Sequence, residues 1–180
     1  QVPTLSQLIP AQVQDGGAVL GFSYHDLMAR LMTDGPDDAW QRLQEIIAWY
    51  DDTQAAGGYR AFYADPKNGG TLQGGNVAGG LGLDKEFFES ILVPQVMLYG
   101  FLGFHPTTEG FAVAPRLPKD WPELTITHIH LHGAVFGITA RENTLVLTGT
   151  TQPTEPLQVA LPPDWSLTST PPTFAVPKHP

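Results

Sequence analysis

Three carboxylates lie close together at the predicted start of one helix, and they are the residues best suited to chemistry. Asp84, Glu86 and Glu89 follow a glycine-dense loop that runs from Gly69 to Gly82. Glu86 and Glu89 are about one helical turn apart, so they share a face of that helix. Because glycines let a backbone approach a ligand closely, this loop and its carboxylates suit the binding of a sugar. Acid–base chemistry on a glycosidic bond also uses carboxylates.

A structural role is the alternative for the same residues. Glu86 could complete a capping arrangement with Asp84, the predicted N-cap, while Glu89 could simply be solvated. The glycine-rich loop is not followed by Lys and Ser or Thr, so it lacks the pattern of a nucleotide phosphate loop. We therefore expect Gln73, Asn76 and Asp84 to contact a sugar substrate rather than a nucleotide.

Other candidates lie nearer the N-terminus. Asp15 precedes Gly16 and Gly17, so it could accept hydrogen bonds from sugar hydroxyls or merely shape a turn. Tyr24 and Tyr59 could stack on the faces of sugar rings. Asp65 is a further candidate catalytic carboxylate, although an Asp before a proline is also typical of a turn.

Three histidines alternate in a predicted strand, at His128, His130 and His132. At this spacing their side chains would project from one face, and imidazoles on one face can bind a metal ion. A metal-binding β-barrel of the cupin type is therefore an alternative class. No further ligand on a neighbouring strand is identifiable from the sequence, so we predict neither a metal nor another cofactor.

Composition limits the class of protein. The chain has 180 residues, an apolar fraction of 42% and no cysteine, so it has enough apolar residues for a core but no disulfide or thiolate metal site. Its formal net charge of −9 disfavours nucleic acid and anionic membrane surfaces as partners. No apolar run reaches membrane-spanning length, and no signal peptide is recognised. Since the chain starts at Gln1 without Met, an upstream segment could be missing.

Helical periodicity dominates the first part of the chain. Apolar residues at helical spacing predict one helix over residues 24–32 and a second that starts at Pro36 and ends before Gly57 and Gly58. Trp40 belongs to the apolar stripe of the second helix, and core packing is its expected role. A third helix is predicted from Asp84 to about residue 102, with a kink or break at Pro94.

Short strands replace the helices from Phe111 onward. The segments "LTITHIHLHG", "VFGITAR", "TLVLTGT" and "PLQVAL" alternate or are rich in β-branched residues, and Arg141 to Asn143 predict a hairpin turn. The Pro-rich end, "PPTFAVPKHP", is expected to lie extended on the surface. We predict an α+β protein in which residues 1–105 form a helical part and residues 106–180 an antiparallel β-sandwich, with its strands between about 109 and 176.

The third helix is apolar around most of its circumference. Such a helix is buried by more neighbours than this chain supplies, so we expect much of the helical domain to lie in another chain or earlier in a longer polypeptide. The protein would then not fold as an independent unit.

The segment "GFHPTTEGFAVAPRLPKDW" resembles the junction between the last barrel helix and the C-terminal β domain of bacterial six-hairpin glycosidases. The family pattern is a helix ending in G-[VF]-x-P, an EGF or DGL turn, and then I-x-P-x-L-P-x-x-W. It falls here on Gly103, Phe104, Pro106, Glu109, Gly110, Phe111, Pro115, Leu117, Pro118 and Trp121. The segment "VQDGGAVLGFSYHDLMARL" is similar to the ENGG loop of that clan, with Asp15 in place of Asn.

This resemblance implies a fold and an activity. The fold would be an (α/α)6 barrel, of which only about the last two hairpins are present in residues 1–105. The activity would be glycoside hydrolysis with inversion, with the general acid on an earlier barrel loop outside this chain. Glu89, Glu86 or Asp65 would then act as the base or support it. The resemblance covers most of residues 13–140 and does not distinguish glucosidases, rhamnosidases and disaccharide phosphorylases.

Residues Phe87 to Glu89 favour a hydrolase over a phosphorylase. Aligned on Gly103 and Pro106, they fall where the phosphorylases of the clan hold phosphate with small hydroxyl residues and glycine. Bulky phenylalanines and a carboxylate would obstruct and repel a phosphate dianion. A glycoside hydrolase is therefore the predicted function, and a disaccharide phosphorylase or a non-catalytic carbohydrate-binding or assembly module are the alternatives. The expected partners are a carbohydrate and the remainder of the barrel.

Overall fold

The computed structural model describes residues 23–58, 61, 91–151, 155–170 and 174–175. Its contacts group the chain into two compact units. One contains Gln1–Leu27 and Gln41–Val93, and the other contains Met28–Trp40 and Pro94–Pro180. Each unit is described by itself, and the predicted division into residues 1–105 and 106–180 stays a prediction.

The first two predicted helices are confirmed. Helix α2 spans Ser23–Thr33 and helix α3 spans Pro36–Ala55. Between them Gly35 adopts a φ of 97°, which glycine tolerates without steric cost, and its N–H donates to the carbonyl of Arg30 at 2.8 Å. Asp37 and Asp38 lie in the first turn of α3, where the helix dipole favours negative charge. None of the described helices is long and apolar enough to cross a membrane.

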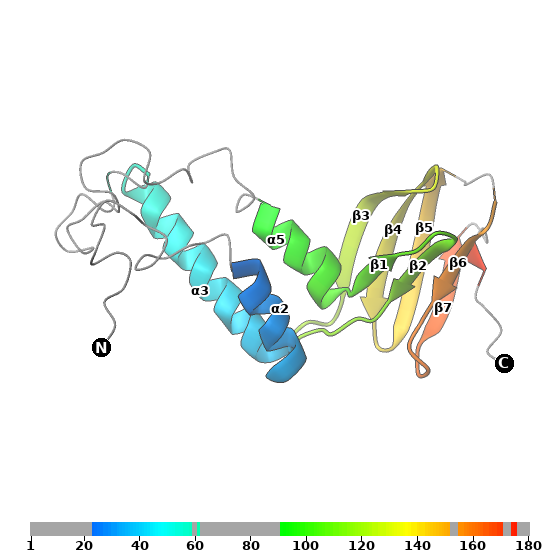
Figure 1. The fold of residues 1–180 in the computed structure, drawn as a ribbon, viewed down its shortest axis with the longest axis horizontal. Coiled ribbons are helices and arrows are strands. Elements are labelled where there is room, and N and C mark those ends of the chain that lie inside the picture. The colour runs from blue at the N-terminus through cyan, green and yellow to red at the C-terminus, as the bar shows by residue number, and fades with distance from the viewer. Residues whose placement is uncertain (1–22, 59–60, 62–90, 152–154, 171–173, 176–180) are drawn as a thin grey trace, which may run out of the picture. The chain divides into compact units, whose positions relative to one another are not determined.

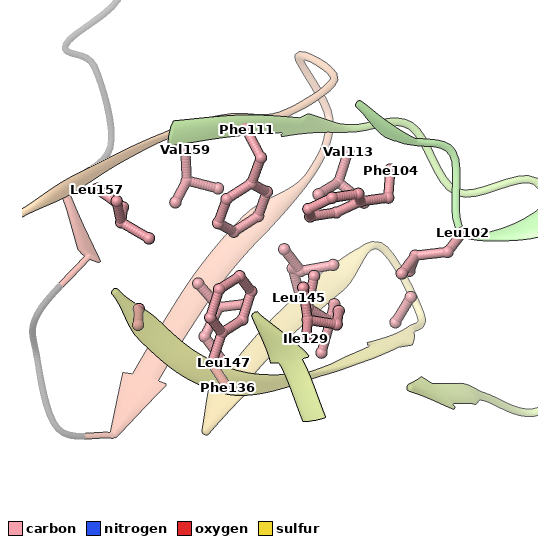
Figure 2. Close-up of a cluster of buried hydrophobic side chains, with 13 residues drawn as sticks. Leu102, Phe104, Phe111, Val113, Ile129, Phe136, Leu145, Leu147, Leu157 and Val159 are labelled. Carbon is pink, nitrogen blue, oxygen red and sulfur yellow. The ribbon is translucent and has the colours of Figure 1, made fainter. Parts of the chain in front are cut away.

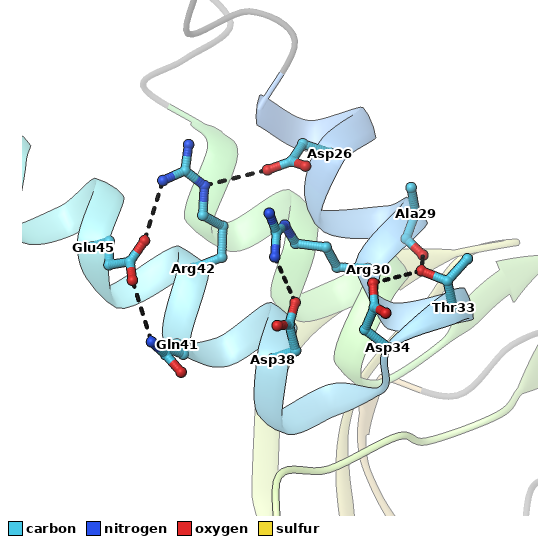
Figure 3. A network of polar contacts seen from close by, with 9 residues as sticks. All are labelled: Asp26, Ala29, Arg30, Thr33, Asp34, Asp38, Gln41, Arg42 and Glu45. Atoms are coloured by element: carbon cyan, nitrogen blue, oxygen red, sulfur yellow. Dashed lines mark hydrogen bonds and ion pairs between the residues drawn. The ribbon is translucent and has the colours of Figure 1, made fainter.

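Ion pairs form between partly exposed side chains of α2 and α3 (Figure 3). Arg30 contacts Asp38 at 2.7 Å, and Arg42 contacts Asp26 at 3.3 Å and Glu45 at 3.2 Å. All of these side chains are at least one third exposed, so water competes with each pair. Each pair therefore contributes little to stability.

The third predicted helix is described only from its middle. It comprises α5 (Leu92–Gln95) and a π-helix, η4 (Val96–Phe101), and its predicted start at Asp84 lies outside the described residues. Helical structure continues through Pro94, and the hydrogen bonding changes from α to π at Val96, two residues later. A kink at Pro94 stays a prediction. Gly100 packs closely on Leu31, since an added Cβ would lie 2.7 Å from a methyl carbon of that side chain.

In the described part of the chain, eight strands form two four-stranded sheets (Figure 1). In order across the first sheet they are β1 (Phe104–Pro106), β2 (Gly110–Val113), β6 (Leu157–Ala160) and β8 (Phe174–Ala175). In order across the second they are β3 (Leu124–Leu131), β4 (Ala134–Arg141), β5 (Thr144–Thr151) and β7 (Ser166–Thr170). The four strands predicted from "LTITHIHLHG" to "PLQVAL" are confirmed. Strands β1, β2, β7 and β8 were not among the segments predicted as strands.

The prediction of a purely antiparallel sandwich is wrong. Strands β1–β2, β3–β4 and β4–β5 pair antiparallel, whereas β2–β6, β5–β7 and β6–β8 pair parallel. After β5 the chain changes sheet at each connection, from β5 to β6, then β7, then β8. The chain therefore forms β6 in the other sheet before it returns to pair β7 with β5, and it forms β7 before it returns to pair β8 with β6. After each such crossing the chain runs in its original direction, so these strands pair parallel.

Apolar side chains from both sheets fill the space between them (Figure 2). Along β4 every second residue is buried, from Ala134 to Ala140, as expected for a strand with one face in the core. Phe111 lies at the centre, with its ring 5.2 Å from the ring of Phe104 and 5.2 Å from the ring of Phe136. It is 1% exposed, so it joins the two sheets through a fully buried aromatic contact.

The predicted hairpin turn after β4 is confirmed. Glu142 and Asn143 have φ values of 44° and 59°, the left-handed pair that a two-residue type I′ turn requires. Arg141 and Thr144 face each other on either side of it.

The predicted row of three histidines on one strand face is not formed. Ile126 and Ile129 of β3 pair with Ile138 and Phe136 of β4, so β3 carries an extra residue there. This bulge interrupts the alternation, with His128 at a φ of 60°. His132 lies beyond the end of β3, in a turn, with a φ of 48°. Among the described residues no group of three His, Cys, Asp or Glu could hold a metal ion.

Candidate functional site

Most of the predicted sugar-site residues lie outside the described part of the chain. They are Asp15, Tyr59, Asp65, Gln73, Asn76, Asp84, Glu86 and Glu89. Tyr24 is described, and it lies half-buried in the first turn of α2 with its ring 5.5 Å from that of His25 in an edge-to-face arrangement. The roles of all these residues stay predictions.

A cavity of about 500 Å³ lies at one end of the sandwich. Three separate segments line it: the turn between β1 and β2, the turn between β3 and β4, and the chain entering β6. The lining residues are Thr108, Glu109, His132, Glu155, Pro156, Leu157 and Gln158. Its volume falls within the range of about 300–1,000 Å³ that is usual for small-molecule sites.

Hydrogen bonds hold these segments together. The Thr107 N–H donates to the carbonyl of Gly110 at 2.8 Å and closes the β1–β2 turn. His132 Nε2 lies 2.8 Å from the carbonyl oxygen of Thr107. Since a carbonyl oxygen only accepts, Nε2 is the protonated nitrogen and donates. The Gln158 N–H donates to the carbonyl of Glu109 at 3.0 Å, which joins the turn to β6.

Gly110 permits the close pairing of β2 with β6 beneath this cavity. A Cβ at this position would lie 2.0 Å from the carbonyl oxygen of Gln158, closer than any real contact. Only glycine therefore fits here. The glycine of the EGF motif has a structural role, because it lets the segment with Glu109 lie against the segment with Gln158.

The cavity has the chemistry of a hydrogen-bonding site. Ionised Glu109 and Glu155 would accept hydrogen bonds, and the Gln158 amide both donates and accepts. All three side chains are exposed, whereas Leu157 is 3% exposed and contributes to the core. Polar groups beside the exposed Pro156 suit a ligand that has both hydroxyl groups and C–H surface.

Sequence reasoning did not bring these residues together. Glu109 was noted as part of a motif, and His132 was considered as a metal ligand. A usable signal was present, because the polar segments "TTEG", "LHG" and "TEPLQ" each adjoin a strand end. The sequence could not show that these three ends are neighbours.

A second feature is the segment Ala114–Trp121, which fastens the β domain to helical residues of the same unit. The Arg116 guanidinium donates to the carbonyl of Leu31 at 3.0 Å. Asp37 accepts from the backbone N–H of Lys119 at 2.8 Å and pairs with its Nζ at 2.9 Å. The Trp121 ring lies 4.8 Å from that of Trp40 and 5.0 Å from that of Phe101. The conspicuous "RLPKDW" segment is therefore a structural clamp, and Trp40 has the packing role expected for it.

The clamp predicts a pH dependence of stability. The backbone N–H of Lys119, and then its side chain, hold the pKa of Asp37 below the ordinary value of 3.8. Asp37 therefore stabilises the fold above pH 3.8, and this contribution is lost as the pH falls through the lowered pKa. The same pairing raises the pKa of Lys119 above 10.5, so its contribution is present below pH 10.5 and is lost as the pH rises through the raised pKa.

We expect Asp37→Asn to lower the melting temperature slightly at pH 7 and not at all at a pH below the pKa of Asp37. Thermal unfolding of the two proteins across this range measures the difference. Asp164→Asn is the control, because Asp164 is exposed in a turn. An equal difference at both pH values would show that the effect does not come from the charge on Asp37.

Comparison with known families found a match, which falls on the β domain. Residues 105–164 match the family model described as Glycosyl hydrolase family 65, C-terminal domain. The match covers about one third of the chain and includes strands β2 to β6 entirely. It supports a C-terminal β domain of a carbohydrate-active enzyme family. Searches of curated proteins and of solved structures found no match to this chain.

Proposed function

We propose that this chain is the C-terminal part of a glycoside hydrolase that cleaves a glycosidic bond in an oligosaccharide or polysaccharide. The observation that carries the proposal is the match of residues 105–164 to the C-terminal domain of a glycosyl hydrolase family. The glycine-rich loop and the carboxylates that follow it supply the sugar-binding chemistry. In this proposal water adds across the bond, so that one product gains a hydroxyl group and the other a proton.

The proposed base is Glu89 or Glu86, with Asp65 as the next candidate. Inversion needs a second carboxyl group about 6.5–9.5 Å away as the acid, with room for a water between them. We place that acid outside this chain, on an earlier loop of the helical barrel. Asp15, Tyr24, Tyr59, Gln73, Asn76 and Asp84 are the proposed sugar-binding residues.

Hydrolysis is favoured over phosphorolysis by Phe87, Phe88 and Glu89. The matched family includes phosphorylases, so the match alone is compatible with either reaction. Two phenylalanines and a carboxylate make a poor phosphate site, because they fill space and repel an anion. Turnover of disaccharides by the complete enzyme, with and without inorganic phosphate, tests this. Free sugar formed without phosphate supports the proposal, whereas a strict need for phosphate with formation of a sugar phosphate would replace it by a disaccharide phosphorylase.

The proposed macromolecular partner is the remainder of the (α/α)6 barrel, in the same polypeptide or another chain. Large apolar side chains on the described helices are exposed, and Met32 reaches 75%. The others are Tyr50, Ile91, Val93 and Tyr99, each between 37% and 46% exposed. Exposed large apolar side chains such as these suit burial against a partner.

We therefore expect the 180-residue chain alone to associate or to melt without cooperativity, and its natural assembly to have a larger mass. Native mass spectrometry and calorimetry measure both properties. A monodisperse monomer of 19.5 kDa with one cooperative transition would contradict this prediction. If the natural assembly contains no catalytic acid and has no turnover, the alternative of a non-catalytic carbohydrate-binding or assembly module would stand instead.

A further inference from the structure

We propose that the cavity between the β1–β2 turn, the β3–β4 turn and the start of β6 binds a neutral saccharide. This inference rests on the proposed function, from which it takes the class of ligand. It goes further by assigning a binding site to the β domain itself. The residues that carry it are Glu109, His132, Glu155 and Gln158.

The site is held in shape by contacts that do not depend on a ligand. Backbone hydrogen bonds tie Thr107 to Gly110 and Glu109 to Gln158, and His132 ties the neighbouring turn to Thr107. The pairing of β2 with β6, in which Gly110 lies opposite Gln158, holds these two segments side by side. Because the rim is already ordered, a ligand would lose little binding free energy in ordering it.

The lining matches the chemistry of a pyranose. Sugar hydroxyls donate hydrogen bonds to ionised carboxylates, and such charge-assisted bonds are the stronger kind. The amide of Gln158 can donate to a ring or hydroxyl oxygen in return. Pro156 is exposed and provides apolar surface for the C–H groups of the ring, whereas Leu157 packs in the core beside it.

Charge selects among possible ligands. Two carboxylates line the cavity, and none of its described lining residues is Lys or Arg. The whole chain carries a net charge of −9. A phosphorylated or otherwise anionic sugar would be repelled, so a neutral saccharide is the expected occupant.

His132 provides a local probe of occupancy. Its Nε2 donates to Thr107, so Nδ1 is the acceptor nitrogen of the neutral ring. A ligand in the cavity changes the surroundings of this ring and hence its NMR frequencies. The signals that disappear from the spectrum of His132→Asn identify those of His132 among the labelled histidines of the complete enzyme. Asn tolerates the left-handed φ at this position.

The experiment titrates the complete, histidine-labelled enzyme with maltose and with cellobiose, which differ in linkage. We expect saturable shifts of the His132 signals, and no shift with glucose 6-phosphate. Glu109→Gln and Glu155→Gln preserve side-chain size and should each weaken the binding about tenfold or more, because each loses a charge-assisted acceptor. Glu142→Gln is the matched control, since Glu142 is an exposed carboxylate in the β4–β5 turn away from the cavity lining.

Three results would overturn the proposal. The His132 signals could stay unchanged with both disaccharides, they could respond to glucose 6-phosphate instead, or the two cavity variants could bind as tightly as the control.

Turnover measured in the same preparations separates the two proposals. Normal turnover with unresponsive His132 signals refutes the cavity site alone. Saturable shifts without any turnover support the cavity site and refute the hydrolase.

Discussion

Changing the catalytic base to its amide should reduce the turnover of the complete enzyme by about 10²–10⁴-fold. We expect this result for Glu89→Gln or Glu86→Gln, measured on aryl glycosides with each variant tested singly. A carboxylate that activates water must accept a proton, and an amide of the same size cannot do so. The fold should be unaffected, because Gln keeps the volume and the helix propensity of Glu.

The competing explanation makes a different prediction for the same variants. If Glu86 only completes a helix cap and Glu89 is solvated, each loss should cost no more than about 1 kcal/mol of stability and leave the rate intact. Circular dichroism and the melting temperature establish that the variants are folded, and Glu142→Gln serves as a surface control. Near-full rates in both folded variants would exclude both residues as the base, and Asp65→Asn would be the next variant to measure.

Removing the Phe111 ring should destabilise the β-sandwich by about 3–5 kcal/mol, the usual cost of Phe→Ala in a core. Phe111 is 1% exposed and contacts Phe104 in its own sheet and Phe136 in the other. Phe111→Ala would therefore leave a cavity where the two sheets meet. Native-state hydrogen exchange in the complete protein measures the effect, since the amides of β4 and β5 report the opening of this core.

The expected loss of amide protection is about 100- to 1,000-fold or more. Phe111→Leu should lose less, because much of the buried volume is retained. His105→Ala is a control on the neighbouring strand, where the side chain is exposed and its loss should change stability by no more than about 0.5 kcal/mol. Equal protection in Phe111→Ala and His105→Ala would contradict the central position of Phe111 in the core.

The structure explains why both positions 103 and 110 of the motif are glycine. Gly103 has a φ of 65°, and a Cβ there would lie 2.3 Å from the carbonyl oxygen of Ala114. A Cβ at Gly110 would likewise lie 2.0 Å from the carbonyl oxygen of Gln158. The motif therefore marks close backbone contacts at the junction of helix and sandwich, and its Trp121 marks the clamp. None of its residues needs a catalytic role to be explained.

Local features were predictable from the sequence because nearby residues determine them. The alternation in β4, the left-handed turn at Glu142 and Asn143, and the helix start at Pro36 each depend on residues a few positions apart. The resemblance carried by the segment from Gly103 to Trp121 also indicated the glycosidase class that the family match supports. The carboxylates Glu86 and Glu89 were found by the same local reasoning, and their role stays a prediction.

Pairing between distant segments was decided only by the tertiary structure. The sequence predicts that β5 and β6 are strands, but not that the chain crosses from one sheet to the other between them and so pairs β5 in parallel with β7. A single extra residue in β3 moved His128 into a bulge, which a strict alternation could not predict. The cavity depends in the same way on the hydrogen bonds from Gln158 to Glu109 and from His132 to Thr107, which join segments far apart in the chain. Residue types and spacing therefore determine the elements, whereas the packing of one sheet against another determines which of their ends meet to form a site.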